Sequence, residues 1–271
     1  MARIIVITSG KGGVGKTTTT SNIGMALARL GHSTLLVDAD VGLRNLDLLL
    51  GLENRIIYTG LDVLAKTCRL EQALIQDKRE PNLTFFPLSS NQVQTPITEL
   101  EIQELIDSLR HKYEFILIDS PAGIDDSFKV SIVPAEEAII VVTPEVPSIR
   151  DADKVIGILI SQGIEKISLI INRIRPNMVK TDDMMSIVDV TNILGVPLIG
   201  AIPDSEQIII ASNRGEPLVL DQILSLPGLA FENTARRFLG EKIDFLTLDL
   251  STSGNLVQRF INFFNRKPLK K

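Results

Sequence analysis

One short loop constrains this chain more than any other feature of its sequence. The string Gly-Lys-Gly-Gly-Val-Gly-Lys-Thr at residues 10–17 fits the pattern G-x-x-x-x-G-K-[ST]. It follows an apolar run at residues 4–8 and opens a segment with helical spacing at residues 16–30. Glycines let backbone N–H groups turn inward as an anion nest, and the helix N-terminus adds its positive dipole end. The sequence therefore predicts a phosphate-binding loop between the first strand and the first helix.

The residues of this loop have distinct expected roles. Lys16 can reach the β- and γ-phosphates of a nucleotide, and the Thr17 hydroxyl can ligate Mg²⁺. Lys11 is a second lysine near the start of the loop. It is either a solvated loop residue or a cation that reaches a nucleotide in a facing subunit. The expected nucleotide-binding set is Gly10, Lys11, Gly12, Gly13, Val14, Gly15, Lys16, Thr17 and Thr18.

Short β-branched runs alternate with segments of helical spacing along the rest of the chain. Seven runs predict strands, at residues 4–8, 34–38, 83–87, 115–119, 138–143, 167–172 and 198–202. Five segments predict helices, at residues 16–30, 98–111, 150–162, 181–194 and 205–213. Most of the strands are apolar almost throughout, which is typical of strands buried on both faces. We expect an α/β fold: a doubly wound, mostly parallel sheet of the P-loop NTPase type with helices on both faces.

Three aspartates stand at or just after the ends of predicted parallel strands, the edge that faces the ligand crevice. Asp38 closes one strand, and Asp40 lies two residues on, at the same side of an extended chain. One of the two can hold a metal-bound water while the other orients the attacking water. Asp119 ends another strand at the Walker B position, where a carboxylate usually meets Mg²⁺ through water. We assign Asp38 and Asp119 to the metal site with Thr17, and Asp40 to catalysis with Lys16, with a solvated strand end as the alternative for Asp38 and Asp40; Lys11 joins the catalytic set by the resemblance described next.

Residues 11–18 resemble the deviant Walker A motif of the MinD/ParA class of P-loop ATPases, and the strings that begin at Asp38 and Asp119 resemble its two switch segments. The resemblance runs through residues 1–267. It implies ATP and Mg²⁺ as cofactors, and a Lys11 that contacts phosphate across an ATP-sandwich homodimer. By the same resemblance, four residues at the ends of later strands line the adenine pocket, with strand-end caps as the alternative reading. These are Asn172, Arg173, Pro203 and Asp204.

The end of the chain has a different charge from the rest. The whole chain has a net charge of −5, but residues 250–271 hold five basic residues and no acid, so residues 1–249 have a net charge of −10. Apolar residues of this tail share one face of a predicted helix and polar or basic residues share the other. Such a helix suits the surface of an anionic bilayer, and docking on the body's own core is the alternative. The expected membrane contacts are Leu256, Val257, Arg259, Phe260, Ile261, Phe263, Phe264, Arg266 and Lys267.

We therefore expect an ATPase domain at residues 1–246, a linker at 247–254 and a membrane-targeting tail at 255–271. The resemblance implies an ATP hydrolase whose ATP-dependent dimer binds membrane reversibly and places a cell or plastid division site. It implies three partners: a second copy, a MinE-like ATPase stimulator and a MinC-like division inhibitor. It places their docking surface on the helix that begins near Ser148 and Ile149. The expected location is the cytoplasm and inner face of the cell membrane, or a plastid stroma and inner envelope membrane.

Composition argues against several other classes. Cys68 is the only cysteine, which excludes an intramolecular disulfide and an iron–sulfur cluster that takes two cysteines from each subunit. The acidic body offers no general attraction to nucleic acid, so no nucleic-acid partner is expected; a ParA-like ATPase for DNA or cargo positioning is the alternative function. A metabolic kinase would leave the tail unexplained. No apolar run approaches the roughly 20 residues of a membrane span, and we expect no signal peptide.

Overall fold

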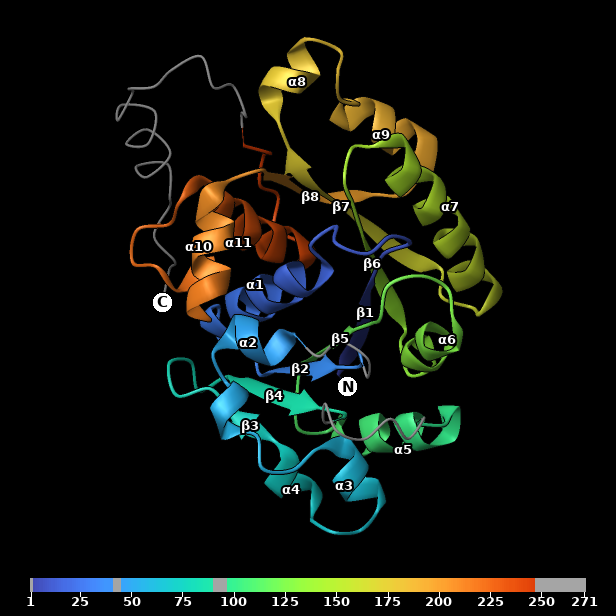
Figure 1. Ribbon diagram of the computed structural model, residues 1–271, viewed down its shortest axis with the longest axis vertical. Helices are drawn as coiled ribbons and strands as arrows, with labels where there is room; N and C mark the ends of the chain where they lie inside the picture. Colours follow the sequence, from blue (N-terminus) through green and yellow to red (C-terminus); the bar gives the residue numbers. More distant parts are fainter. Residues whose placement is uncertain (1, 41–44, 90–96, 247–271) are drawn as a thin grey trace.

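A computed structural model describes residues 2–40, 45–89 and 97–246 of the 271-residue chain. Its centre is an eight-stranded sheet in the order β3-β4-β2-β5-β1-β6-β7-β8 (Figure 1). All strands are parallel except β3, which pairs antiparallel with β4 at one edge. The fold prediction is confirmed, and all seven predicted strands form. The strands are β1 Arg3–Thr8, β2 Thr34–Asp38, β3 Ile75–Gln76, β4 Leu83–Pro87, β5 Phe115–Asp119, β6 Glu137–Val142, β7 Lys166–Ile174 and β8 Leu198–Pro203.

Helices cover both faces of the sheet (Figure 1). One face packs against α5, α6, α7 and α9, and the other packs against α1, α2 and α11. The α-helices are α1 Lys16–Arg29, α2 Leu46–Leu50, α3 Gly60–Leu64, α4 Leu70–Ala73, α5 Glu99–Leu109, α6 Asp126–Ile132, α7 Val146–Ser161, α8 Pro176–Lys180, α9 Ile187–Leu194, α10 Glu206–Arg214 and α11 Leu226–Phe238. Two short 3₁₀ turns are η1 Glu53–Arg55 and η2 Leu218–Leu220. None of the helices in the described part of the chain is long and apolar enough to cross a bilayer.

The strand order places β1 near the middle of the sheet, between β5 and β6. The connection from β1 leads through α1 toward β2, on the β5 side. The connection from β5 leads through α6 to β6, on the other side. Chains that leave in opposite directions open a crevice at the carboxyl ends of the strands, where α/β sheets bind ligands.

Two helices begin more than two residues from the expected position, and one long helix was not expected. The helix predicted at residues 181–194 begins only at Ile187, because Asp182 has a positive φ of 57° and Ser186 caps the helix through a hydrogen bond from the Asp189 N–H. The helix predicted from residue 150 begins at Val146. Helix α11 was not predicted, since Pro227 and Gly228 look like helix breakers. Pro227 lies in the first turn, where a proline is tolerated.

Candidate functional site

The glycine-rich loop joins β1 to α1, as the motif requires. Gly13 and Gly15 have φ angles of 77° and 94°, a region that residues with a side chain rarely adopt. Gly15 is the N-cap of α1 and no side chain caps the helix there. The first N–H groups of α1 are therefore available to an anion. Lys16 is the first residue of that helix and is 7% exposed.

Asn172 braces this loop from β7. Its Nδ2 donates a 2.8 Å hydrogen bond to the Val14 carbonyl. A Cβ placed on Gly15 would lie 2.3 Å from the same Nδ2, so the close approach requires glycine. The Asn172 Oδ1 is buried and has no hydrogen-bond partner among the described residues. That acceptor is left for a ligand donor such as an exocyclic amine.

The other predicted adenine-pocket residues gather at the ends of β7 and β8. Ile174 and Pro203 are register partners, and the Asp204 N–H donates to the Ile174 carbonyl at 2.9 Å. Arg173 is exposed and has a positive φ of 58°. The Asp204 carboxylate accepts from Arg175 Nε at 2.6 Å, a contact that the sequence did not indicate. The four predicted residues thus lie at one corner of the crevice, with Asn172 turned toward the phosphate loop.

Asp38 and Asp119 are register partners on neighbouring strands, and both are at most 2% exposed. Asp38 accepts from the backbone N–H groups of Asp40 and Leu46, at 3.1 and 3.2 Å. Asp119 accepts a hydrogen bond from the Thr20 hydroxyl at 2.9 Å and a second one from the Thr17 side chain, and both act to lower its pKa. The two carboxylates, with Thr17 beside them, form one buried polar cluster.

Burial raises the pKa of Asp38 well above its usual value, and the neighbouring Asp119 carboxylate adds to the shift. Burial also raises the pKa of Asp119, against the opposing effects of Lys16 and the two threonines. Two buried carboxylates that both resist ionisation are suited to a cation. Among residues 2–40, 45–89 and 97–246, no group of three His, Cys, Asp or Glu side chains could hold a metal. The donors present, two carboxylates and the Thr17 hydroxyl, are of the kind that Mg²⁺ takes, with water and phosphate to complete its shell.

Lys11 lies at the rim of the crevice. Its Nζ forms a 3.2 Å ion pair with Glu145, the residue just before α7. Both side chains are about half exposed, at 43% and 52%. Sequence reasoning missed Glu145, because 134 residues separate it from Lys11. Asp40, partly exposed, faces the same cluster closely enough to raise the pKa of both Asp38 and Asp119.

The start of the phosphate loop rests directly on α7. A Cβ on Gly10 would lie 2.4 Å from the backbone carbonyl of Asp151, so the two backbones are in contact. The helix predicted to begin near Ser148 and Ile149 is α7, and these two residues are 2% and 3% exposed, so other side chains form its exposed surface. Ser148 Oγ accepts from the Thr143 N–H, which anchors it inside. The residues predicted to bind membrane all lie in 255–271, outside the described residues.

These features define a P-loop nucleotide-binding domain: a doubly wound sheet, a glycine-rich loop after a central strand, and buried aspartates on adjacent strand ends. The sequence profile of the CobQ/CobB/MinD/ParA nucleotide binding domain matches residues 5–218. A relative from Emiliania huxleyi is 69% identical over 261 residues, which is 96% of each chain.

Solved structures agree. A chain of the MinC:MinD cell division protein complex from Aquifex aeolicus is 47% identical, with a TM-score of 0.85 over 91% of this chain and 99% of that one. The septum site-determining protein MinD complexed with Mg-ADP from Pyrococcus horikoshii is 33% identical, with a TM-score of 0.79 over 88% and 96%. The chain belongs to the MinD family of septum site-determining ATPases.

Proposed function

We propose that this chain hydrolyses ATP to ADP and phosphate, and that ATP closes a homodimer which binds membrane through residues 255–271. The observation that carries the proposal is the convergence of Lys16, Thr17, Asp38 and Asp119 at the ends of β1, β2 and β5. A buried cation beside two buried carboxylates suits a magnesium–phosphate ligand. The Pyrococcus horikoshii relative was solved in complex with Mg-ADP, which supports the same ligands here.

Each residue has one role in this proposal. Thr17, Asp38 and Asp119 hold Mg²⁺, and the bound metal supplies positive charge to the phosphate oxygens. Lys16 and the N–H groups of the loop hold the phosphates. Asp40 orients the attacking water at the partly exposed side of the cluster. Asn172, Arg173, Pro203 and Asp204 hold the base, where the unpaired Asn172 Oδ1 accepts from its amino group.

Lys11 contributes across the dimer. In the single chain it is paired with Glu145 at the rim of the crevice rather than turned toward Lys16. An exposed ion pair of this kind contributes only about 0–1 kcal/mol, so Lys11 is easily released to a phosphate of the facing subunit.

A dimer also explains reversible membrane binding. One apolar side chain contributes roughly 1.5–3 kcal/mol at full burial, and membrane insertion of a surface helix is partial. Ordering the tail costs about 1–2 kcal/mol per residue, so a single tail binds marginally. Two tails on one dimer reinforce each other through effective concentration. Nucleotide-dependent dimerisation therefore becomes nucleotide-dependent membrane binding.

The proposed biological role is placement of a division site in a bacterial cell or a plastid. The proposed partners are a MinC-like division inhibitor, supported by the Aquifex aeolicus complex, and a MinE-like stimulator. Both would meet exposed side chains of α7 such as Val146 and Arg150 rather than the buried Ser148. The proposed location is the cytoplasm and inner cell membrane, or the plastid stroma and inner envelope.

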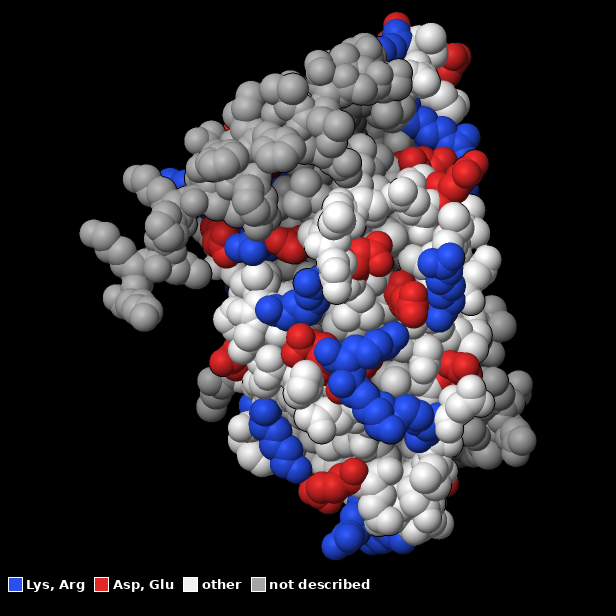
Figure 2. All heavy atoms as spheres, turned by 90° about the vertical axis from the view of Figure 1, so that its left-hand side faces the viewer, with Lys and Arg blue, Asp and Glu red and all other residues white. Residues whose placement is uncertain are grey.

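A ParA-like role on DNA is the second candidate, and charge argues against it. Residues 1–249 have a net charge of −10. Figure 2 shows Lys and Arg side chains in the lower half of the face that lies on the left-hand side of Figure 1, with Asp and Glu side chains among them. A mixed surface gives little of the sequence-independent phosphate attraction on which such proteins depend.

The decisive experiment is co-sedimentation of the full chain with anionic liposomes in Mg-ATP against Mg-ADP. We expect binding with ATP only, and its loss in Phe260→Asp, which puts a charge in the middle of the apolar stripe. Ile57→Asp is the matched control, since Ile57 is 80% exposed on the body and tolerates the same charge. Lys11→Ala should lose both the ATP-dependent dimer and the liposome binding. Equal sedimentation in ATP and ADP, or retained binding in Phe260→Asp, contradicts the proposal.

A further inference from the structure

Two short helices end against each other beside the nucleotide crevice. Gly51 caps the carboxyl end of α2 and Gly215 caps that of α10, and both glycines have a positive φ, of 61° and 65°. A Cβ on Gly215 would lie 2.7 Å from the Gly51 Cα, so the two helix ends touch backbone to backbone. Each end carries carbonyl groups that lack a partner within the helix and that form the negative end of its dipole.

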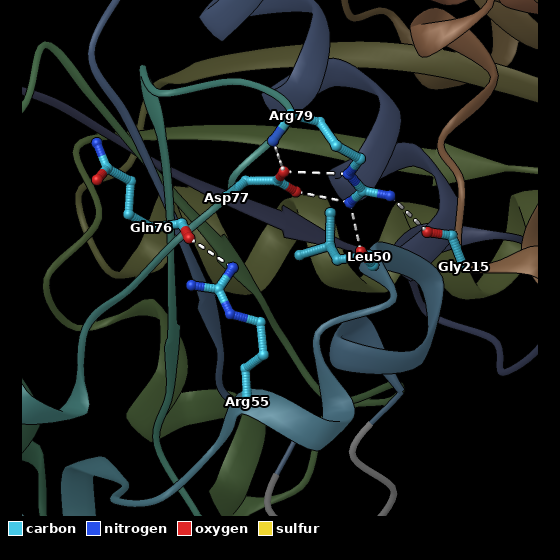
Figure 3. Close-up of polar contacts among 6 residues, drawn as sticks. All are labelled: Leu50, Arg55, Gln76, Asp77, Arg79 and Gly215. Atoms are coloured by element: carbon cyan, nitrogen blue, oxygen red, sulfur yellow. Dashed lines mark hydrogen bonds and ion pairs between the residues drawn. The ribbon is translucent and has the colours of Figure 1, made fainter.

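Arg79 lies between these two ends and donates to both (Figure 3). Its Nη2 donates to the Leu50 carbonyl at 2.5 Å, and its Nη1 donates to the Gly215 carbonyl at 3.1 Å. Its Nε and Nη2 also donate to the Asp77 carboxylate, at 3.0 and 2.6 Å. The planar fork of a guanidinium can serve these three acceptors at once, whereas an ammonium group cannot.

Asp77 fixes the arginine in this position. It is 2% exposed, and although burial raises its pKa, the hydrogen bonds from Arg79 outweigh that effect and hold the pKa below its usual value. The ion pair with Asp77 therefore holds the Arg79 guanidinium in place for its hydrogen bonds to the Leu50 and Gly215 carbonyls. Arg79 comes from the segment between β3 and β4, so it ties three separate parts of the chain together.

The far ends of both helices lie at the candidate nucleotide site. The Leu46 N–H at the start of α2 donates to Asp38 Oδ2 at 3.2 Å. Helix α2 has five residues and is about 7.5 Å long, so a displacement at Leu50 reaches Leu46. Helix α10 begins two residues after Asp204, at the end of β8.

We propose that Arg79 is a positioning residue: by holding the carboxyl ends of α2 and α10 together, it sets the Leu46 N–H on the Asp38 carboxylate and couples the metal side of the site to the base side. The inference rests on the nucleotide and Mg²⁺ binding proposed above. Arg79 touches neither ligand. It acts through the backbone of α2, whose Leu46 N–H is the direct hydrogen-bond partner of the proposed metal ligand Asp38.

The test measures ADP affinity of the full chain by calorimetry, with Mg²⁺ and with EDTA. In wild type, Mg²⁺ should tighten ADP binding. Arg79→Lys keeps a cation beside Asp77 but cannot serve both carbonyls, so the gain from Mg²⁺ should fall roughly tenfold, the lower end of the range for such partners. Arg55→Lys is the matched control. Arg55 donates to the Gln76 carbonyl at 2.8 Å, and no hydrogen bond to α2 or α10 is found for it in the described residues (Figure 3).

A second pair of variants separates positioning from stability. Asp77→Asn removes the buried charge but keeps one acceptor oxygen for Arg79, so it should lower the melting temperature while the Mg²⁺ gain falls less than in Arg79→Lys. Gly215→Ala forces the helix ends apart with the Arg79–Asp77 pair intact, so it should lose the gain. An unchanged Mg²⁺ gain in Arg79→Lys or Gly215→Ala, or an equal loss in Asp77→Asn, overturns the inference. A wild-type chain that binds no ADP overturns the proposed function, and this inference with it.

Discussion

Gly15→Ala tests how the phosphate loop is held, because Gly13→Ala offers a control with the same backbone strain. Both glycines have a positive φ, and a side chain in that region costs about 1–2 kcal/mol. A Cβ on Gly13 meets nothing within 4 Å, whereas a Cβ on Gly15 lies 2.3 Å from Asn172 Nδ2. The clash breaks the Asn172–Val14 hydrogen bond inside the protein, which adds about 1 kcal/mol.

Gly15→Ala should therefore lose about 2–3 kcal/mol and Gly13→Ala about 1–2 kcal/mol of unfolding free energy. At about 2–4 °C per kcal/mol for a chain of this size, the two melting temperatures should differ by roughly 3 °C. Thermal unfolding of the nucleotide-free protein, followed by circular dichroism, measures both. In an Asn172→Ala background the clash partner is gone, and Gly15→Ala should cost no more than Gly13→Ala. If Gly15→Ala costs the same in both backgrounds, the brace from Asn172 does not exist.

Three further predictions follow from the buried and exposed charges. Asp119→Asn should raise the melting temperature of the metal-free protein at pH 7, because the raised pKa of Asp119 means that its ionised form destabilises the folded state, by about 1.4 kcal/mol for each unit of pKa shift. Below about pH 4 the carboxyl group is protonated in both the folded and the unfolded state, so the gain in stability should vanish. A gain that does not change with pH contradicts this explanation. Glu137→Gln should destabilise the protein at pH 7, because hydrogen bonds from Arg3 and Lys166 lower the pKa of Glu137 even though burial raises it. The difference in stability between the variant and wild type should shrink as the pH falls and Glu137 becomes protonated. A loss of stability that does not depend on pH argues against the two ion pairs. Lys11→Ala should leave the unfolding free energy of the nucleotide-free protein within about 1 kcal/mol of wild type, and a larger loss shows that the pair with Glu145 is structural.

The sequence predicted seven of the eight strands because most of these are nearly continuous apolar runs, whereas the two-residue strand β3 gives no such run. It predicted the phosphate loop and the strand-end aspartates for a related reason: their spacing along the chain is itself the signal. Helix α11 was missed because proline and glycine usually indicate the end of a helix, whereas here Pro227 and Gly228 lie in the first turn, where proline is tolerated. Glu145 and the Arg79 contacts could not be predicted, since each depends on segments that only the folded sheet brings together. Asn172 was expected at a strand end, where it lies, but its hydrogen bond to Val14 depends on the three-dimensional path of the loop.

The contact between Gly10 and Asp151 gives α7 two working sides. Its outer side presents Val146, 68% exposed, to solvent, while its inner side touches the residue that opens the phosphate loop. Within the described residues, α7 is therefore the one helix that lies between solvent and the phosphate loop at this point. A protein bound to the exposed side of α7 would act on the phosphate loop directly, because the backbone of this helix contacts Gly10. In the function proposed above, a partner bound to α7 would therefore contact the same helix that supports the phosphate loop, and partner binding and nucleotide binding would affect each other.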